Sequence, residues 1–454
     1  MSAGKKLYNA VFTAGFMAAA PFYFLKMWRR GNWRAGFGQR FGRYGAKLKQ
    51  SLTNRHVLWL HAVSVGEVNL CTQLIAAIEP AMPNLKIVVS TTTSTGMAEL
   101  QRKLPSHIAK IYFPVDRRAW VSRAMAVLHP DAIVLVEAEI WPNFLWRARE
   151  SHIPVFLVNA RLSPKSFQGY KRFRFLFGPL FGSLKGVGVQ NEADAQRLRE
   201  LGCAPEAVQV VGNLKFDSVR LDDKPPMDAG RLLRQLGVAE NQRVLVAGST
   251  HAGEEALLAE IFIRLKKQFT DLFLVLVPRH FERGREVGEI LKRQGLRFVY
   301  RTELSVDHPF EPNALDCLLV NTTGELKQFY KHATVAFVGK SLTAEGGQNP
   351  IEPAAEGKAV VFGPNMQNFA SIAEAFVRAG AAVQVRDAEE LEATLTELLQ
   401  DAERRMELGR KAIRVVQENR GAIQRTVSMI ARCLDAEEIY VAPEFGGTGE
   451  KADH

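Results

Sequence analysis

Short runs of apolar residues recur along the chain and alternate with stretches of helical periodicity. In the first half each run is four to nine residues long and mostly continuous, as expected for strands buried on both faces of a sheet. Helical stretches such as "CTQLIAAIEP" lie between them. The alternation predicts βα units that build a parallel sheet. The candidate strands are "HVLWLHAVS" (56–64), "KIVVSTTT" (86–93), "KIYFPV" (110–115), "AIVLVEAE" (132–139), "VFLVNA" (155–160), "GVGVQ" (186–190) and "VQVVGN" (208–213).

The segment "DSVRLDDKPPMDAG" at 217–230 interrupts this pattern with charge, paired prolines and glycine, which is typical of a linker. The alternation then resumes in "RVLVAGST", "LFLVLVPR", "DCLLVNTT", "VAFVG", "AVVFGP" and "AAVQV". We therefore expect an α/β protein with two Rossmann-like, doubly wound domains facing a central cleft, whose ligands bind beyond the carboxyl ends of the strands. The predicted parts are a membrane anchor or interfacial segment (1–30), an N-terminal Rossmann-like domain (31–216), a linker (217–240), a C-terminal Rossmann-like domain with closing helices (241–436) and a disordered tail (437–454).

The N-terminal segment contains an uncharged, largely apolar run, "LYNAVFTAGFMAAAPFYFL" at 7–25. Its length just suits a membrane helix, although Asn9, Thr13 and Pro21 weaken it. Three interpretations remain open: a cleaved signal peptide, a buried core helix, and an uncleaved anchor that spans the membrane or lies in its interface. The aromatic residues and the basic residues that flank the run favour the anchor.

The charge of the chain is unevenly distributed. The 454 residues carry a formal net charge of +11, yet residues 1–66 hold eleven Lys and Arg and no Asp or Glu, so the remainder is balanced. Basic residues beside an apolar run are more typical of an anionic membrane surface than of a nucleic-acid interface. The four cysteines are far apart and form no CxxC pair, which suits a reducing cytosol. We expect the body of the protein in the cytoplasm, beside an anionic membrane surface and without a nucleic-acid partner.

Several common catalytic signatures are incomplete. "VGKS" at 338–341 follows a strand, but Thr334 stands where a P-loop needs glycine, and "GVGVQN" ends in Asn191 rather than the glycine of a dinucleotide fingerprint. The sequence has no HExxH, no zinc-like Cys/His spacing and no GxSxG elbow. Kinases, zinc enzymes and serine hydrolases are therefore disfavoured.

Polar residues gather instead where predicted strands end. Glu67, the first acidic residue of the chain, follows a strand and opens a helix, where a carboxylate can serve as a proton acceptor or simply as a helix cap. Glu137 and Glu139 close another buried strand, and burying two unpaired carboxylates is costly. Lys215 and Asp217 lie at the domain junction, where a lone lysine is ordinarily a solvated surface residue.

In the second half, Ser249 and Thr250 form a candidate phosphate or donor loop, and Arg279 supplies a cation. The segment "GGQNPIEPAAEG" places glycines and an Asn-Pro step before a short helix that carries Glu352. A carboxylate there could accept the two hydroxyls of a ribose. For each loop taken alone, ordinary turn chemistry explains the residues equally well.

Together and in this order, the loops resemble the 3-deoxy-D-manno-octulosonic acid (Kdo) transferase family of lipopolysaccharide biosynthesis. The motifs that carry the resemblance are "HAVSVGEV", "EIWPNF", "NARLSPKS", "VGNLKFD", "AGSTHAGEE", "PRH", "GEL" and "GGQNPIEPAAEGKAVVFGP", within roughly residues 5–430. The resemblance implies a GT-B fold and a membrane-associated, inverting enzyme that moves Kdo from CMP-Kdo to a lipid A precursor. It implies neither a cofactor nor a metal.

The resemblance also implies roles for individual residues. The proton acceptor of the family falls on Glu67, and transition-state roles fall on Glu139 and Lys215. This chain departs from the family at Lys340, where many members have glycine, and at Asn321 and Asn365. The implied CMP contacts are Pro278, Arg279, Thr323, Gly324, Glu325, Asn349, Pro350, Ile351 and Glu352.

The segment "RLSPKSFQGYKRFRFLFGPLF" at 161–181 interleaves cations with aromatic residues and is a candidate lipid contact through Lys171, Arg172 and Arg174. A solvated basic helix with its aromatic residues in the core remains the alternative. For the whole protein two other functions remain open: a soluble nucleotide-sugar epimerase of the same fold, and a non-enzymatic nucleotide-binding membrane adaptor.

Overall fold

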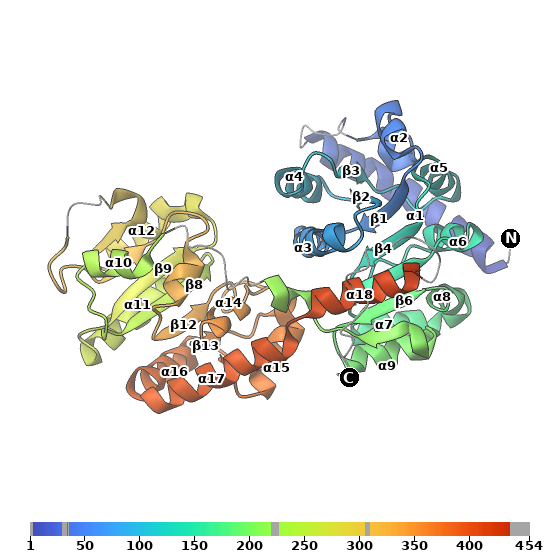
Figure 1. Cartoon of the computed structure of the whole chain (residues 1–454). Coiled ribbons are helices and arrows are strands. Elements are labelled where there is room, and N and C mark those ends of the chain that lie inside the picture. Colours follow the sequence, from blue (N-terminus) through green and yellow to red (C-terminus); the bar gives the residue numbers. More distant parts are fainter. Residues whose placement is uncertain (1–2, 30–33, 35, 219–226, 305–308, 436–454) are drawn as a thin grey trace, which may run out of the picture. The chain divides into compact units, whose positions relative to one another are not determined.

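The computed structural model describes residues 3–29, 34, 36–218, 227–304 and 309–435, and these form two compact units (Figure 1). The first comprises Met1–Ser218 with Arg420–His454, and the second comprises Val219–Asn419. The predicted disordered tail (437–454) and the paired prolines of the predicted linker lie outside the described residues.

The first unit contains a seven-stranded sheet in the order β3-β2-β1-β4-β5-β6-β7, in which neighbouring strands are parallel. The order reverses between β1 and β4, which makes the carboxyl ends of these two strands the topological switch point, where such sheets bind ligands. The strands are β1 (His56–His61), β2 (Leu85–Thr91), β3 (Ala109–Tyr112), β4 (Ala132–Val136), β5 (Val155–Ala160), β6 (Gly186–Val189) and β7 (Val208–Val210).

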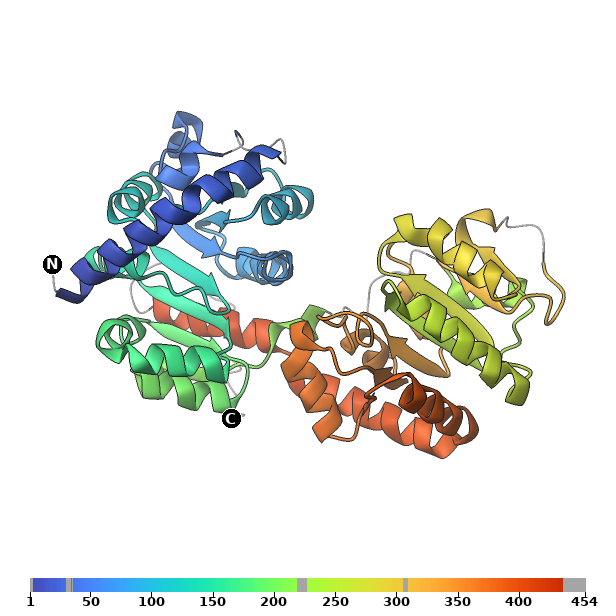
Figure 2. The same cartoon turned by 180° about the vertical axis from the view of Figure 1, so that it is seen from behind.

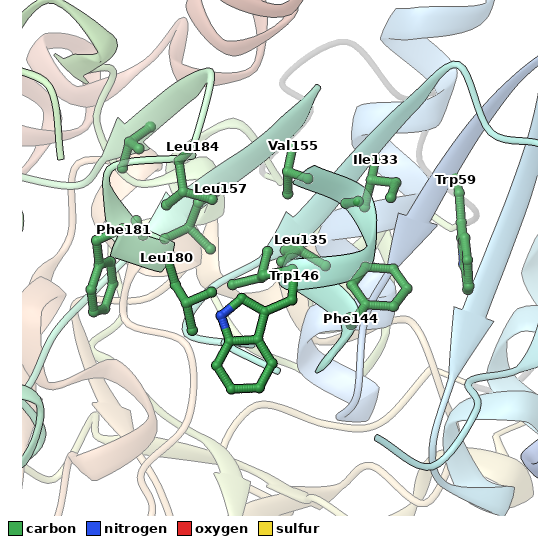
Figure 3. Close-up of a cluster of buried hydrophobic side chains, with 14 of the residues drawn as sticks. Trp59, Ile133, Leu135, Phe144, Trp146, Val155, Leu157, Leu180, Phe181 and Leu184 are labelled. Atoms are coloured by element: carbon green, nitrogen blue, oxygen red, sulfur yellow. The ribbon is translucent and has the colours of Figure 1, made fainter. Parts of the chain in front are cut away.

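Alternate residues of each strand point to opposite faces of this sheet. Helices cover both faces. Val57 and Trp59 join one apolar cluster, seen in Figure 3, whereas Leu58 and Leu60 join the other. The helices of the unit are α1 (Ala3–Arg29), α2 (Ala46–Leu52), α3 (Val65–Ala81), α4 (Ser94–Lys103), α5 (Arg118–Leu128), α6 (Pro142–Glu150), α7 (Pro164–Arg172), α8 (Arg174–Phe181), α9 (Glu192–Leu201) and α18 (Ala422–Asp435).

Helix α18 corrects the predicted domain boundary, which placed residues up to 436 in the C-terminal domain. The helix buries one face in the first unit, against the cluster formed by β1, β2 and α3 (Figure 1). Its N-terminus is held by Asp217, whose carboxylate accepts the N–H groups of Gly421 and Ile423, both at 2.7 Å. The contributing side chains of α18 are Val427, Met429, Ile430, Ala431 and Leu434.

The second unit contains another seven-stranded sheet, in the order β10-β11-β9-β8-β12-β13-β14, again with parallel pairs. The carboxyl ends of β8 and β12 form its switch point. Its strands are β8 (Val244–Thr250), β9 (Phe273–Pro278), β10 (Phe298–Tyr300), β11 (Cys317–Leu319), β12 (Val335–Val338), β13 (Ala359–Phe362) and β14 (Val383–Gln384). The short edge strand β10 was not predicted, because "FVY" lies among charged residues.

The helices of the second unit include α10, which corrects the predicted linker (217–240). Leu233, Leu236 and Val238 are buried against β8 and β9, so residues 227–240 belong to this unit. The helices are α10 (Ala229–Gln235), α11 (Glu254–Gln268), α12 (Gly284–Arg293), α13 (Leu326–Tyr330), α14 (Ile351–Ala355), α15 (Ala370–Arg378), α16 (Ala388–Gln400) and α17 (Ala402–Asn419).

Helix α1 lies along the outside of the first unit (Figure 2). Three polar contacts hold it there: Tyr8 Oη donates to Asp116 Oδ2 at 2.8 Å, Asn9 and Asn143 exchange amide hydrogen bonds, and Lys5 pairs with Glu150 at 2.9 Å. By length and composition α1 could cross a membrane. Its opposite face exposes Leu7, Val11, Met17, Phe22, Leu25 and Trp28.

Candidate active site

Glu67 lies in the turn between β1 and α3, at the switch point of the first unit. Ser64 is the N-cap of α3, and its hydroxyl accepts the N–H of Glu67 at 3.2 Å. In return, the Glu67 carboxylate accepts the N–H groups of Val63 at 2.9 Å and Ser64 at 3.3 Å. This capping box fixes the orientation of the carboxylate. Glu67 therefore caps helix α3 in this structure, and this capping does not exclude a further role in proton transfer.

The Glu67 carboxyl is poorly solvated, with 9% of the residue exposed. Burial raises its pKa above the usual value, while the hydrogen bonds from Val63 and Ser64 oppose the shift and the charge of Glu137 adds to it. A carboxylate with a raised pKa is a stronger proton acceptor than a fully solvated one.

Glu137 and Glu139 follow β4, the neighbour of β1 in the sheet. Glu137 adopts a left-handed conformation (φ 64°), which is uncommon for a residue other than glycine and recurs at functional sites. Glu139 Oε2 accepts a hydrogen bond from Trp141 Nε1 at 2.8 Å. Burial is the largest cause that raises the pKa of Glu139 to about 7; the hydrogen bond from Trp141 opposes this shift, and the charges of Glu67 and Glu137 add to it.

Lys215 lies in the short 3₁₀ helix Leu214–Ser218 that follows β7. Burial lowers its pKa, whereas the charges of Glu137 and Glu67 favour the protonated form. Asn159, at the end of β5, supports this loop because its Oδ1 accepts the N–H of Leu214 at 3.1 Å. The loops after β1, β4 and β7 thus bring three acids and one lysine to one edge of the sheet.

The sequence reasoning did not identify His61, which ends β1 beside this group of acids. The ring is fully buried and stacks on the ring of Phe113, with 3.8 Å between the ring centroids. Its Nδ1 contacts Ser90 Oγ at 2.9 Å, and its Nε2 lies 4.0 Å from Glu139 Oε2. The available signal was a histidine at the end of an otherwise apolar strand, directly before the Glu67 turn.

The switch point of the second unit is formed by the ends of β8 and β12. Ser249 has a left-handed φ of 55° where the register of β8 against β9 shifts. Ser249 is partly exposed, whereas Thr250 is fully buried. Of this candidate loop, Ser249 therefore presents the more accessible side chain.

The loop after β12 is fixed by a buried carboxylate. Glu254, in the first turn of α11, accepts the N–H groups of Lys340, Ser341 and Leu342 at 2.6, 2.8 and 3.0 Å. Lys340 adopts φ 54°, a region that glycine tolerates best. The family resemblance implies glycine in many members at this position, and in this chain a lysine occupies the left-handed conformation.

Arg279 and Glu352 are close enough for the charge of Arg279 to lower the pKa of Glu352, although burial is the larger effect and raises it. Arg279 is exposed and follows β9. Glu352 accepts a hydrogen bond from Asn349 Nδ2 at 3.2 Å, and Asn349 Oδ1 accepts the N–H of Ile351 at 3.1 Å. The predicted nucleotide contacts Pro278, Pro350 and Ile351 are buried, so any contact from them would come through their main chain.

The predicted loop Thr323–Gly324–Glu325 follows β11. Thr323 and Gly324 are exposed, and Gly324 has φ 86°. The carboxylate of Glu325 is occupied, because Arg301 donates to both of its oxygens at 3.0 and 3.2 Å. A ligand contact from this loop would therefore use Thr323 or the backbone.

The candidate lipid contact lies on α7, α8 and the turn between them. Lys171, Arg172 and Arg174 are exposed, as are Phe173 (48%) and Phe175 (66%). Phe167, Tyr170 and Phe177, by contrast, pack against the core. The segment therefore has some of its aromatic residues in the core and others exposed beside the cations, and the lipid contact stays a prediction. One hollow of about 620 Å³ is lined by both α1 and α8, so the two candidate membrane segments are neighbours.

Comparison with known proteins tests the family. A family model described as 3-deoxy-D-manno-octulosonic-acid transferase (kdotransferase) matches residues 35–218, and a model described as glycosyl transferases group 1 matches 313–415. Among solved structures, a UDP-GlcNAc 2-epimerase from Neisseria meningitidis covers 83% of this chain at a TM-score of 0.56, with all of that chain covered. Because the two sequences are only 13% identical, this structural similarity shows the GT-B fold alone.

Curated relatives are more similar in sequence. The 3-deoxy-D-manno-octulosonic acid transferase of Bordetella pertussis is 32% identical over 437 residues, 93% of this chain and 98% of that protein. The enzyme of the same name from Haemophilus influenzae is 30% identical over 89% of this chain and 92% of that protein. Similarity that spans both units, rather than the fold alone, confirms the resemblance found in the loops: the chain belongs to the Kdo transferase family and is a glycosyltransferase of GT-B fold.

Proposed function

We propose that this enzyme takes Kdo from CMP-Kdo and transfers it, with inversion, to a lipid A precursor at the cytoplasmic face of a bacterial inner membrane. The observation that carries the proposal is the group of Glu67, Glu139 and Lys215 at the switch point of a unit that matches the family model. Relatives named as Kdo transferases along nearly the whole chain support it.

In this proposal Glu67 is the base. An acceptor hydroxyl is a poor nucleophile until its proton is removed, and a positioned base typically contributes about 10²–10⁴-fold. The carboxylate takes the hydroxyl proton while the oxygen attacks the anomeric carbon of Kdo, and CMP leaves with the electrons of the broken C–O bond. The N–H groups of Val63 and Ser64 hold the carboxylate in place for this step.

Glu139 and Lys215 are proposed to stabilise the transition state. The partly buried ammonium of Lys215 offers positive charge close to Glu67 and Glu137. Positive charge that is fixed in place and shielded from water stabilises negative charge that develops as a bond breaks. Glu139, whose pKa burial raises to about 7, adds no negative charge beside Glu67 in its neutral form, so it does not oppose the charge that develops on the leaving group.

The donor is proposed to bind the second unit. Arg279 suits the phosphate, and Glu352 with Asn349 suits the ribose hydroxyls. Thr323, Gly324 and Ser249 add exposed polar groups. The main-chain N–H of Arg279 donates to the carbonyl oxygen of Thr250 at 2.9 Å, whereas its guanidinium forms no hydrogen bond or ion pair with another described residue that would compete with a phosphate.

The acceptor is anionic and acylated, so its surroundings need cations beside apolar surface. Helix α1 and the α7–α8 segment supply both on the first unit. We propose that α1 lies in the membrane interface rather than across the bilayer. Its contacts with Asp116, Asn143 and Glu150 hold it against the body of the unit, and its apolar face points away from that body.

The test is an incubation of the full chain with CMP-Kdo and a lipid A precursor in anionic vesicles. We expect release of CMP coupled to a gain of Kdo mass on the lipid. Release of CMP that does not require the lipid would contradict the transfer and favour the hydrolysis or epimerisation expected of a soluble relative. If the protein binds CMP-Kdo but releases no CMP, the result would favour a non-enzymatic adaptor.

A further inference from the structure

The first unit buries a histidine whose second ring nitrogen lacks a hydrogen-bond partner among the described residues. His61 Nε2 is buried and unpaired, and Glu139 Oε2 is 4.0 Å away. An unsatisfied buried polar atom ordinarily costs about 1–3 kcal/mol. Its position beside the carboxylate group therefore calls for a function.

The other ring nitrogen determines the tautomer of His61. Nδ1 lies 3.2 Å from the carbonyl oxygen of Ser90, which can only accept, and 2.9 Å from Ser90 Oγ. That hydroxyl already accepts from Trp59 Nε1 at 2.8 Å. We therefore assign the ring hydrogen to Nδ1, which leaves a lone pair on Nε2 directed towards Glu139.

A lone pair facing an ionised carboxylate would be repelled, whereas a carboxyl group would satisfy both atoms. In its neutral form, Glu139 Oε2 can accept from Trp141 Nε1 and donate to His61 Nε2. A movement of about 1 Å would bring the 4.0 Å separation to hydrogen-bond length. Stacking on Phe113 holds the ring in the required plane.

We propose that His61 is a positioning residue, whose Nε2 accepts a hydrogen bond from the carboxyl O–H of Glu139 and so keeps Glu139 neutral beside Glu67. Three acids share this edge of the sheet, and one proton held at Glu139 allows Glu67 to remain ionised as the base. No bond other than this hydrogen bond is made or broken. The inference rests on the proposed function only in giving Glu67 that role.

The charges around Glu139 agree with this assignment. Glu67 and Glu137 both disfavour a second negative charge, and Tyr170 faces Glu139 from α7. The charges of Glu137 and Glu67 favour the protonated form of Lys215, so a positive charge lies near these two acids. Burial lowers the pKa of His61 to about 3, so the ring stays neutral and the shared proton stays on Glu139 near pH 7.

The test compares two substitutions whose amide groups differ in position by the length of one methylene group. The amide of His61→Asn reaches the place of Nδ1 and preserves the contact with Ser90, whereas the longer His61→Gln places an amide oxygen near the position of Nε2. Infrared titration of the full chain without substrates follows the protonated carboxyl band, which is assigned by its loss in Glu139→Gln.

We expect the midpoint of that band to fall by about one pH unit in His61→Asn, because the neutral carboxyl loses its acceptor, and to recover in His61→Gln. The alkaline limb of kcat should shift in parallel. Equal midpoints in the wild type, His61→Asn and His61→Gln would overturn the proposal, as would equal shifts of the midpoint in the two variants. If His61→Asn does not fold, His61→Phe, which keeps the stack on Phe113, takes its place with the same expected shift.

The infrared result is independent of turnover. A shifted midpoint in a protein that transfers no Kdo would therefore support the pairing of His61 with Glu139 and contradict the proposed function alone.

Discussion

At the scale of single residues, Glu67→Gln separates capping from catalysis. Glutamine is also accepted in a capping box, so the N-terminus of α3 and the thermal stability should be nearly unchanged. The amide cannot take a proton, and turnover should fall by about two to four decades. Steady-state kinetics alongside thermal unfolding make this comparison. Near-normal turnover would leave Glu67 with its capping role alone.

Glu139 should make the stability of the protein depend on pH. Its folded pKa of about 7 exceeds that of an unfolded glutamate, so the folded state binds more protons between these values. The free energy of unfolding should therefore decrease as pH rises from about 4.5 through 7. Glu139→Gln removes this dependence and should be more stable than the wild type at pH 8, by about 1–3 kcal/mol. Urea unfolding at pH 5 and pH 8 measures the difference, and an identical pH dependence in both proteins would contradict it.

Lys340 has a backbone conformation that a side chain disfavours. Lys340 has φ 54°, and replacing it by glycine removes a conformational strain of about 1 kcal/mol. Lys340→Gly should therefore raise the free energy of unfolding by up to that amount, whereas Lys340→Ala should not. Urea unfolding of the two variants is a matched comparison, because both remove the long side chain. Equal stabilities for the glycine and alanine variants would show that the conformation carries no strain.

At the scale of elements, α1 presents two different faces. One makes polar contacts with Asp116, Asn143 and Glu150, and the other is apolar and exposed. Replacing Val11, Phe22 and Trp28 by Ser should lower the binding of the protein to vesicles at least tenfold, since burying each such side chain contributes about 1.5–3 kcal/mol. Co-sedimentation measures the binding.

The control for this prediction is Met406→Ser on α17, which removes an equally exposed apolar side chain from the second unit. It should leave vesicle binding unchanged. If the triple variant sediments with vesicles as well as the wild type does, α1 is not the membrane-binding element.

At the scale of the whole molecule, the net charge of +11 comes from the first 66 residues, and Lys171, Arg172 and Arg174 add local positive charge to the same unit. Each cation near an anionic surface contributes about 1 kcal/mol, so replacing these three by Ser should weaken vesicle binding by up to about 100-fold at low salt. The difference should shrink as ionic strength rises. The apparent KM for the lipid should increase, while CMP-Kdo binding should not change.

A matched control replaces three exposed arginines of the second unit, Arg378, Arg386 and Arg414, by Ser. Net charge falls by the same amount, so equal losses in the two proteins would assign the effect to total charge. Unchanged vesicle binding and lipid KM in the first variant would make the α7–α8 segment an ordinary surface.

The sequence by itself determined the architecture and the positions of the candidate site residues along it. Continuous apolar runs predicted thirteen of the fourteen strands, because a strand buried on both faces must be apolar along its length. Polar residues at the ends of those runs could be placed at the carboxyl edge, because parallel strands all end on the same side. The ordered motifs identified the family, which the comparisons confirmed.

The tertiary structure decided which distant residues meet. Asp217 caps a helix more than 200 residues further along the chain, and this packing assigns α18 to the first unit. The position of His61 Nε2, 4.0 Å from Glu139 Oε2, and the two faces of α1 could likewise not be predicted from the sequence. A local pattern reports whether a residue is buried, but the identity of its neighbour depends on how the sheet orders its strands and on which helix covers each face, and those contacts join residues far apart in sequence.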